Sequence, residues 1–339
     1  AAANFAKAAG QSAALSYSAT ATAGLPLPMA SKVFLSGGSK GSTSAANIVS
    51  AVTEMESIDV NFVVPLFSRD ASEDIAEGLS ESGSTYTIDA VNALVKSHVL
   101  KMSTSKIKKH RSAFLSFWGS YADAKSRAQS LANARVSLAM QKTSQANSQG
   151  VVVNQLPWHT AAIAAGMQAA GFYKSITNKF ANVIAYTDPS GFDSGSPGQI
   201  EEALDAGLLF MEKAVVGVKW VSDQTTYGID TNFVYNSIQA MYAADLVALD
   251  LAASFQVAFV GQSLADVDAS TAIAFLASKM DQYKKQKLIA ASDDAPLGFK
   301  NAKVKISGPI MEVKVEIKLA TAILFIPINI DISQVQSAA

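Results

Sequence analysis

The chain has 339 residues, of which 49% are hydrophobic and 16% are charged, and its formal net charge is -1. This length suits two or three subdomains, and the near-neutral charge argues against bulk attraction to nucleic acid or anionic lipid. The absence of cysteine excludes disulfides, thiol catalysis and thiolate metal sites. Few charges and many alanines favour a subunit that buries surface in an assembly.

The N-terminal region, residues 1–32, is rich in Ala, Ser and Thr and ends in Gly24-Leu25-Pro26-Leu27-Pro28. Such a composition forms little structure alone, so we expect an extended arm. It lacks the continuous apolar stretch of a signal peptide.

Residues 33–188 carry an alternation of strand-like and helix-like segments, which predicts an α/β domain with a largely parallel sheet. Its early part could instead join the core domain described next. The predicted strands are 33–35, 60–65, 113–117 and 136–140, and the predicted helices are 45–55, 86–102 and 160–173.

A turn-rich loop at 187–198 is the clearest internal boundary, and residues 189–300 are expected to form a mixed core domain. The expected elements are helices at 199–206, 233–251 and 271–291 and strands at 208–211 and 215–221. The apolar stretches 161–173 and 246–260 fall short of the roughly 20 residues that a membrane-spanning helix needs.

Residues 301–339 are expected to form a C-terminal β-arm. From Met311 onward, charged and apolar residues alternate, so one face of the strand is charged and the other apolar. A second β-prone run, residues 323–332, contains Pro327, which confines it to a sheet edge or a bulge. A hydrophobic edge strand needs cover, so we expect strand exchange with another subunit. The residues assigned to this inter-subunit strand are Val313, Val315, Ile317, Ile323, Phe325, Ile326, Ile328, Ile330 and Ile332.

One motif points to catalysis. Gly37-Gly38-Ser39-Lys40-Gly41 matches G-x-S-x-G between a predicted strand and helix, as in an α/β serine hydrolase with Ser39 as nucleophile and His159 downstream. However, only a short segment precedes Ser39, whereas such hydrolases place several strands before the nucleophile, so a plain strand-to-helix turn is favoured. The same loop fails both phosphate-binding patterns, because Lys40 precedes Gly41.

The histidines His98, His110 and His159 lack metal-binding spacing, so surface or helix-capping roles are expected. The basic run 106–111 could contact phosphates, but a solvated rim is favoured. No paired carboxylates or His-Asp dyad emerges, so we expect no enzyme, no cofactor and no metal.

A lysine cluster near the last helix could be a solvated face or a docking patch for an acidic partner. Its members are Lys279, Lys284, Lys285 and Lys287.

Taken in chain order, several segments resemble the tail sheath proteins of contractile bacteriophages and contractile injection systems. Phe34-Leu35-Ser36-Gly37-Gly38 resembles the family's L-x-G-G start, and 160–171 followed by 175–179 resembles its A-A-x-x-A-G … N-K segment. Residues 202–209 resemble L-x-x-A-G, and the arm 311–332 resembles the paired terminal strands. The P-G-V-Y-like first strand of the family is not found here.

The resemblance implies an α+β or α/β multi-subdomain sheath fold, with the core domain facing an inner tube. It implies hexameric rings stacked helically, joined by terminal arms that add strands to neighbouring subunits. Contraction would drive the tube through a cell envelope without hydrolysis. The implied partners are further copies, the inner tube protein, and baseplate and neck or terminator proteins, without direct nucleic-acid contact or membrane insertion. The implied location is a virion tail assembled in the bacterial cytoplasm, and the lysine cluster would face the tube. Another self-assembling shell or adhesin protein is the remaining alternative.

Overall fold

The computed structural model describes residues 41–320, apart from 105, 172–173, 229–233 and 264–266. Four predicted features therefore lie outside the described residues: the N-terminal arm, the strand 33–35, residues 37–40 of the glycine-rich motif with Ser39, and the second β-prone run 323–332.

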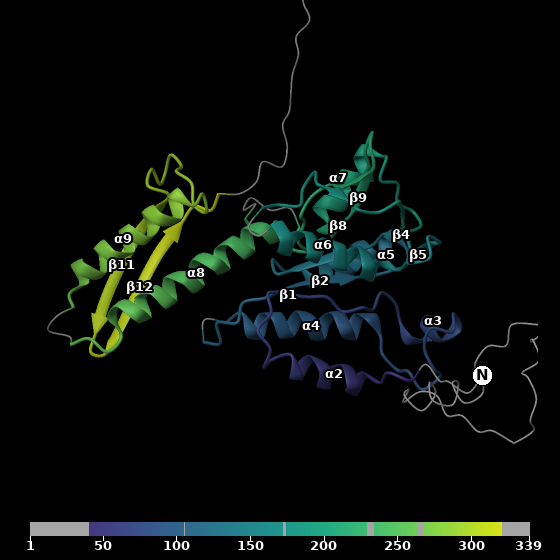
Figure 1. Ribbon diagram of the computed structural model, residues 1–339, viewed down its shortest axis with the longest axis horizontal. Coiled ribbons are helices and arrows are strands. Elements are labelled where there is room, and N and C mark those ends of the chain that lie inside the picture. Colours follow the sequence, from purple (N-terminus) through teal and green to yellow (C-terminus); the bar gives the residue numbers. More distant parts are fainter. Residues whose placement is uncertain (1–40, 105, 172–173, 229–233, 264–266, 321–339) are drawn as a thin grey trace, which may run out of the picture. The chain divides into compact units, whose positions relative to one another are not determined.

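A four-stranded parallel sheet with the order β1-β2-β3-β8 organises the first part of the described chain. Helices α2 and α4 are layered below this sheet in Figure 1, and α6 lies above it. The strands are β1 (Phe62–Val63), β2 (Ser112–Ser116), β3 (Val136–Ala139) and β8 (Leu208–Leu209). The helices are α2 (Ala45–Glu54), α3 (Ala71–Ala76), α4 (Ile88–Met102), α5 (Tyr121–Leu131), α6 (Pro157–Gly171) and α7 (Pro197–Asp205).

Hydroxyl side chains fix where three of these helices begin. Ser44, Thr87 and Ser120 each occupy the N-cap with extended backbone and accept a hydrogen bond from a backbone N–H in the first turn. Each cap satisfies one of the donors that a helix start leaves unpaired. The expected helices 45–55 and 86–102 are thus confirmed, with α4 beginning two residues later than predicted.

The central strand β2 is buried on both faces, as a parallel sheet covered by helices requires. Ala113 and Leu115 pack with the residues of α2, α4, α5 and α7 on one side. Phe114 packs with Ala161 and other small residues of α6 on the opposite side. The alternating side-chain directions of one strand therefore serve two separate apolar cores.

Two small antiparallel sheets complete this part, with the orders β5-β4-β7 and β6-β10-β9. Their strands are β4 (Lys142–Ala146), β5 (Val152–Gln155), β6 (Phe180–Ala181), β7 (Ala185–Thr187), β9 (Met211–Lys213) and β10 (Val218–Trp220). The predicted strand 215–221 begins only at Val218, because residues 214–217 form a turn closed by a hydrogen bond from the Ala214 N–H to the Gly217 carbonyl. Gly217 has a φ of +80°, which a branched residue would not adopt easily.

The turn-rich loop at 187–198 does not end the first sheet. Strand β8 follows this loop, yet Leu208 pairs in parallel with Leu138 and Leu209 with Ala139. Residues on both sides of the expected boundary at 188/189 therefore share one sheet. A division of roles between 33–188 and 189–300 stays a prediction.

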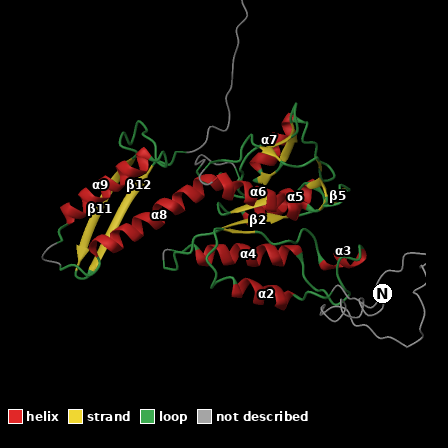
Figure 2. Cartoon of the chain, in the orientation of Figure 1, coloured by secondary structure: helices red, strands yellow, loops and turns green. Residues whose placement is uncertain are grey.

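The last described part consists of two long helices and a hairpin, seen together in Figures 1 and 2. These are α8 (Ile238–Phe259), α9 (Ala269–Lys285), β11 (Phe299–Ser307) and β12 (Ile310–Ile317). The helix expected at 233–251 instead begins after the N-cap Ser237 and continues to Phe259. The helix expected at 271–291 ends at Lys285, because Lys287 adopts a φ of +61°.

Candidate functional site

The hairpin β11–β12 is the feature that the sequence pattern singled out, and its two faces differ sharply. Val313, Val315 and Ile317 are half-buried against a core formed by α8 and α9, which includes Leu276 and Met280. The intervening side chains of β12 are exposed. The period-two pattern predicted from Met311 onward is therefore confirmed, with its apolar face directed at the chain's own helices.

The strand containing these three residues already has a partner within the chain. β11 pairs with β12 antiparallel, with Val304 opposite Val313 and Lys305 opposite Glu312. The alternating pattern predicted an inter-subunit strand that contains Val313, Val315 and Ile317, and it did not predict their pairing with β11. Their role between subunits stays a prediction, and so does that of Ile323, Phe325, Ile326, Ile328, Ile330 and Ile332, which lie outside the described residues.

Among the described residues no third strand pairs with β11 or β12, although Leu319, just beyond β12, forms an antiparallel bridge with Ile289. An open edge presents unpaired N–H and C=O groups that can accept another strand. A two-stranded sheet is also marginal by itself and gains stability from additional strands. The hairpin is thus a geometric acceptor for strand addition.

The outward face of the hairpin carries five charged side chains. On β11 these are Lys303 and Lys305, and on β12 they are Glu312, Lys314 and Glu316. Lys303 lies directly opposite Lys314 in the register. Like charges that face each other across an antiparallel pair are destabilising. The charges on this face are therefore not all matched by opposite charges on the facing strand.

The four lysines expected to form a docking cluster do not all remain free. Lys279 donates a hydrogen bond to Asp250 at 3.2 Å, and Lys285 forms an ion pair with Asp281 at 2.7 Å. Lys284 reaches the Pro296 carbonyl at 3.4 Å, and Lys287 lies beyond the end of α9. Lys284, Lys285 and Lys287 are exposed, whereas Lys279 is half-buried. Their role toward a partner stays a prediction.

A buried ion pair fastens α8 to the parallel sheet. Arg135, immediately before β3, donates two hydrogen bonds of 2.5 and 2.6 Å to Asp245 of α8, and His110 Nδ1 lies 3.2 Å from the same carboxylate. Beyond this point Val247 of α8 joins the core beneath the hairpin. One helix therefore links the sheet to the hairpin. Sequence reasoning missed this pair, because 110 positions separate Arg135 and Asp245 and neither stands in a motif.

Helix α8 is longer than the apolar stretch 246–260 that the sequence indicated. Among the described residues it is the one helix that is long and apolar enough to cross a membrane by length and composition alone, with 22 residues and a mean hydropathy of 1.3. Core helices of soluble proteins share this length and composition. Asp245 and its ion pair lie within this helix.

His98 is buried and His110 and His159 are half-buried, each against a side-chain partner, which corrects the expected surface or capping roles. His98 is 3% exposed and accepts a hydrogen bond from Arg111, with 2.9 Å between Nε2 and Nη1. His159 Nδ1 lies 2.7 Å from the Thr143 hydroxyl, and His110 lies beside Asp245. Burial lowers the pKa of all three histidines. No metal-binding group of three or more His, Cys, Asp or Glu occurs among the described residues.

Part of the basic run 106–111 is structural, although it was expected to form a solvated rim. Arg111 is 1% exposed, and its guanidinium donates to the carbonyls of Met55 and Ile58 at 3.1 and 2.9 Å. Lys109 donates to the Glu56 carbonyl. Lys106 and Lys108 are exposed, so only they fit the expected rim.

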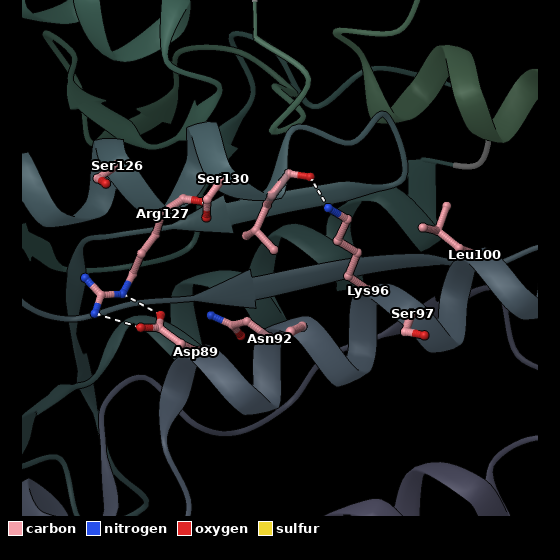
Figure 3. A pocket seen from close by; sticks show the side chains of 10 residues that line it. Asp89, Asn92, Lys96, Ser97, Leu100, Ser126, Arg127 and Ser130 are labelled. Atoms are coloured by element: carbon pink, nitrogen blue, oxygen red, sulfur yellow. Dashed lines mark hydrogen bonds and ion pairs between the residues drawn. The ribbon is translucent and has the colours of Figure 1, made fainter.

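A groove of about 760 Å³ lies between α4 and α5 (Figure 3). Its charged groups are already engaged: Arg127 holds Asp89 through contacts of 2.7 and 3.1 Å, and Lys96 donates to the Leu131 carbonyl. The remaining polar residues are Asn92, Ser97, Ser126 and Ser130, without a neighbouring base to activate a hydroxyl. The groove therefore shows no pairing of a nucleophile with a base among its described residues, as a catalytic site would require.

Asp223 is a buried carboxylate without a cationic partner among the described residues. It accepts hydrogen bonds from the Ser237 hydroxyl at 2.7 Å, the Thr177 hydroxyl at 3.3 Å and the Gln239 N–H at 3.4 Å. Burial raises its pKa. This network joins the chain after β10 to the start of α8, which indicates a structural role.

Comparison with known proteins finds a shared fold. No family model matches the sequence, and no curated protein matches it. A sheath tail protein from Desulfitobacterium hafniense superposes with a TM-score of 0.56 at 14% identity, over 86% of this chain and 59% of that one. The helical sheath of the anti-feeding prophage in its contracted state gives 0.55 at 14% identity, over 84% and 74%. A sheath tail protein from Listeria innocua gives 0.53 at 12% identity, over 80% and 56%. The chain thus has the mixed α+β fold of contractile sheath proteins and spans less than two thirds of the length of the two sheath tail proteins.

Proposed function

We propose that this chain is a structural subunit of a contractile tail sheath, which polymerises around an inner tube and drives it through a cell envelope by contracting. The observation that carries the proposal is the sheath fold with an open-edged hairpin at the end of its described part. Strand addition at such an edge joins subunits through main-chain hydrogen bonds.

The donated strand in this proposal comes from the C-terminal segment of a neighbouring copy. Residues 323–332 are strongly apolar and contain Pro327, which suits a strand paired on one side. Main-chain bonds to a neighbour can persist while the other contacts between subunits rearrange. The joined subunits would then turn nearly as rigid bodies during contraction.

The sheath fold favours a structural role over a catalytic one. The hydrolase alternative is not favoured, because the neighbours in fold are sheath proteins. No step of the proposed mechanism needs a cofactor or a reacting side chain. The free energy would come from an extended lattice that is less stable than the contracted one.

The inner tube, the baseplate and the neck or terminator proteins are the proposed partners beyond further copies. A baseplate of the anti-feeding prophage contains a chain that superposes with a TM-score of 0.52 at 15% identity. The exposed lysines Lys284, Lys285 and Lys287 support a tube-facing end of α9 toward an acidic tube surface. The proposed location is the tail of a phage-like particle, assembled in the bacterial cytoplasm.

Electron microscopy of the purified full chain tests this function. Sheath assembly predicts hollow cylinders with one defined bore, formed from stacked rings. A different self-assembling shell or adhesin would give particles without a uniform bore. A protein that stays monomeric at high concentration by light scattering would contradict the proposal.

A further inference from the structure

The small sheet β6-β10-β9 ends in a group of exposed apolar side chains. The turn between β9 and β10 carries Val215 and Val216, which are 105% and 75% exposed. Phe180 of β6 is 59% exposed and lies beside this turn, because a Cβ added to Gly217 would lie 3.7 Å from its ring. Exposed apolar side chains that are contiguous mark an interaction surface. We call Phe180, Val215 and Val216 the apolar tip.

Two lysines border the apolar tip and are available to an acidic partner. Lys179 directly precedes Phe180, and Lys213 ends β9 just before the turn. Both lysines are exposed, and neither forms an ion pair with a described residue within 4.0 Å, whereas Lys219 is held by Glu212 at 2.9 Å. An apolar centre with a cationic rim fits a protein surface that is apolar and acidic.

Residues 70–81, which contain α3, have this character, and we call them the acidic segment. They include five acidic residues and no basic one, and Leu79 among them is 57% exposed. Arg69 pairs with two of the five, whereas Glu73 is exposed and forms no ion pair with a described residue. The acidic residues are Asp70, Glu73, Asp74, Glu77 and Glu81.

The apolar tip and the acidic segment lie on opposite sides of the parallel sheet. Ala71 and Ile75 of α3 belong to the core on the side of β2 that α2 and α4 cover. Ala181 of β6 and Val218 of β10 belong to the core on the other side of β2. The two surfaces therefore cannot meet within one subunit. A contact between two different surfaces is heterologous, so it can continue from copy to copy.

We propose that the apolar tip of one copy binds the acidic segment of the next copy, with the two valines against Leu79. Lys179 and Lys213 then lie beside acidic side chains of that segment. The contact rests on the proposed sheath function, which places copies in a repeating row, and it adds a connection that does not use the C-terminal segment. Burial of the tip supplies the apolar part of the binding free energy, and the charges around it select the surface that is bound.

Charge reversal in the full-length protein tests this contact. Lys213→Glu and Glu73→Lys each replace an attraction by a repulsion, and each should raise the protein concentration needed for assembly by about tenfold at low salt. An equal mixture of the two variants should assemble like the wild type, because contacts between unlike copies then join opposite charges. The variant that carries both changes should also recover, since it exchanges the two signs. At about 1 M salt, where the Debye length is about 3 Å, the two single variants should approach the wild type.

Lys106→Glu is the matched control, because Lys106 is an exposed lysine on the loop between α4 and β2 and its substitution makes the same change in net charge. Val215→Ser combined with Val216→Ser tests the apolar part: it should raise the concentration needed for assembly by about tenfold and leave the melting temperature unchanged. Wild-type assembly by Lys213→Glu at low salt, or by the valine variant, would overturn the proposal. So would a failure of the mixture to recover, because the acidic segment would then not be the partner of the tip.

The same series separates this contact from the sheath function itself. If the wild type assembles and loses assembly when residues 321–339 are deleted, but is unaffected by the charge reversals, only the tip contact is wrong. If the wild type forms no assembly, the sheath function fails, and the tip contact fails with it.

Discussion

Lys303 and Lys314 lie directly opposite each other on the solvent-facing side of the β11–β12 hairpin. Glu312 and Glu316 stand two positions away from Lys314 on the same strand, which partly offsets the repulsion between the lysines. Lys303 is therefore the lysine of β11 that faces a like charge, whereas Lys305 faces Glu312 across the hairpin.

This arrangement predicts that Lys303→Glu changes the stability of the isolated subunit little. The new attraction to Lys314 is offset by weaker contacts with Glu312 and Glu316, so the free energy of unfolding should stay within about 0.5 kcal/mol of the wild type. Urea unfolding under conditions that keep the protein monomeric checks this value. A loss of more than about 1.5 kcal/mol would show that Lys303 supports the hairpin itself.

The buried pair of Arg135 and Asp245 predicts a large effect. Asp245→Ala leaves the Arg135 guanidinium nearly buried and without its carboxylate, which should cost about 3–5 kcal/mol in the free energy of unfolding. In a cycle of Arg135→Met, Asp245→Leu and the variant that carries both, the double change should cost clearly less than the sum of its two single changes. Additive costs in this urea-monitored cycle would contradict a coupled pair.

Substituting Gly207 by alanine should lower stability for two reasons, its positive φ and a steric clash of the added Cβ. It adopts a φ of +79°, and a Cβ there would lie 2.7 Å from the Thr225 carbonyl oxygen. Gly261 has a similar φ of +88° but nothing within 4 Å of such an atom. Gly261→Ala should cost about 1–2 kcal/mol from the dihedral alone, and Gly207→Ala distinctly more. Equal melting temperatures for the two variants would contradict the close approach.

His98 predicts a loss of stability in acid. Burial, and next the charge of Arg111, lower the pKa of His98 in the folded protein below its ordinary value near 6.5. The unfolded chain therefore binds more protons below pH 6.5, so the stabilisation is complete above that pH and declines as the pH falls. The contribution is at most about 1.4 kcal/mol per pH unit.

Urea unfolding at pH 7, 6 and 5 measures this dependence. His98→Gln keeps an acceptor for Arg111 but cannot titrate, so its stability should fall less between pH 7 and pH 5 than that of the wild type. An unchanged pH dependence in this variant would show that His98 is not a source of the acid sensitivity.

Sequence periodicity located most elements, because their signals are local. The small-residue run in α6 and the alternation after Met311 each reflect contacts repeated along one element. The predicted start of α8 and the predicted end of α9 were wrong, because a single residue sets each of them. Ser237 caps the start of α8, and Lys287 has a positive φ just after the end of α9. The partner strand of β12 was missed, because pairing depends on the turn at Gly308 and on a register shift after Lys300.

The site was predicted only in part for a similar reason. The alternation of charges along β12 predicted which of its side chains face solvent. The sequence did not predict which residues of β11 face solvent, and the difference in charge between the two strands depends on them. The buried surroundings of His98 and Arg111 could not be read from the sequence, because the carbonyls that hold Arg111 come from residues more than 50 positions earlier. A basic run looks the same in sequence whether it is solvated or buried.

Sedimentation of the full chain beside a variant lacking residues 321–339 shows whether subunits join through the C-terminal segment. If they do, the full chain should sediment as large polymers, while the shortened chain should sediment as a folded monomer with an unchanged circular dichroism spectrum. Polymers of equal size from both proteins would contradict it.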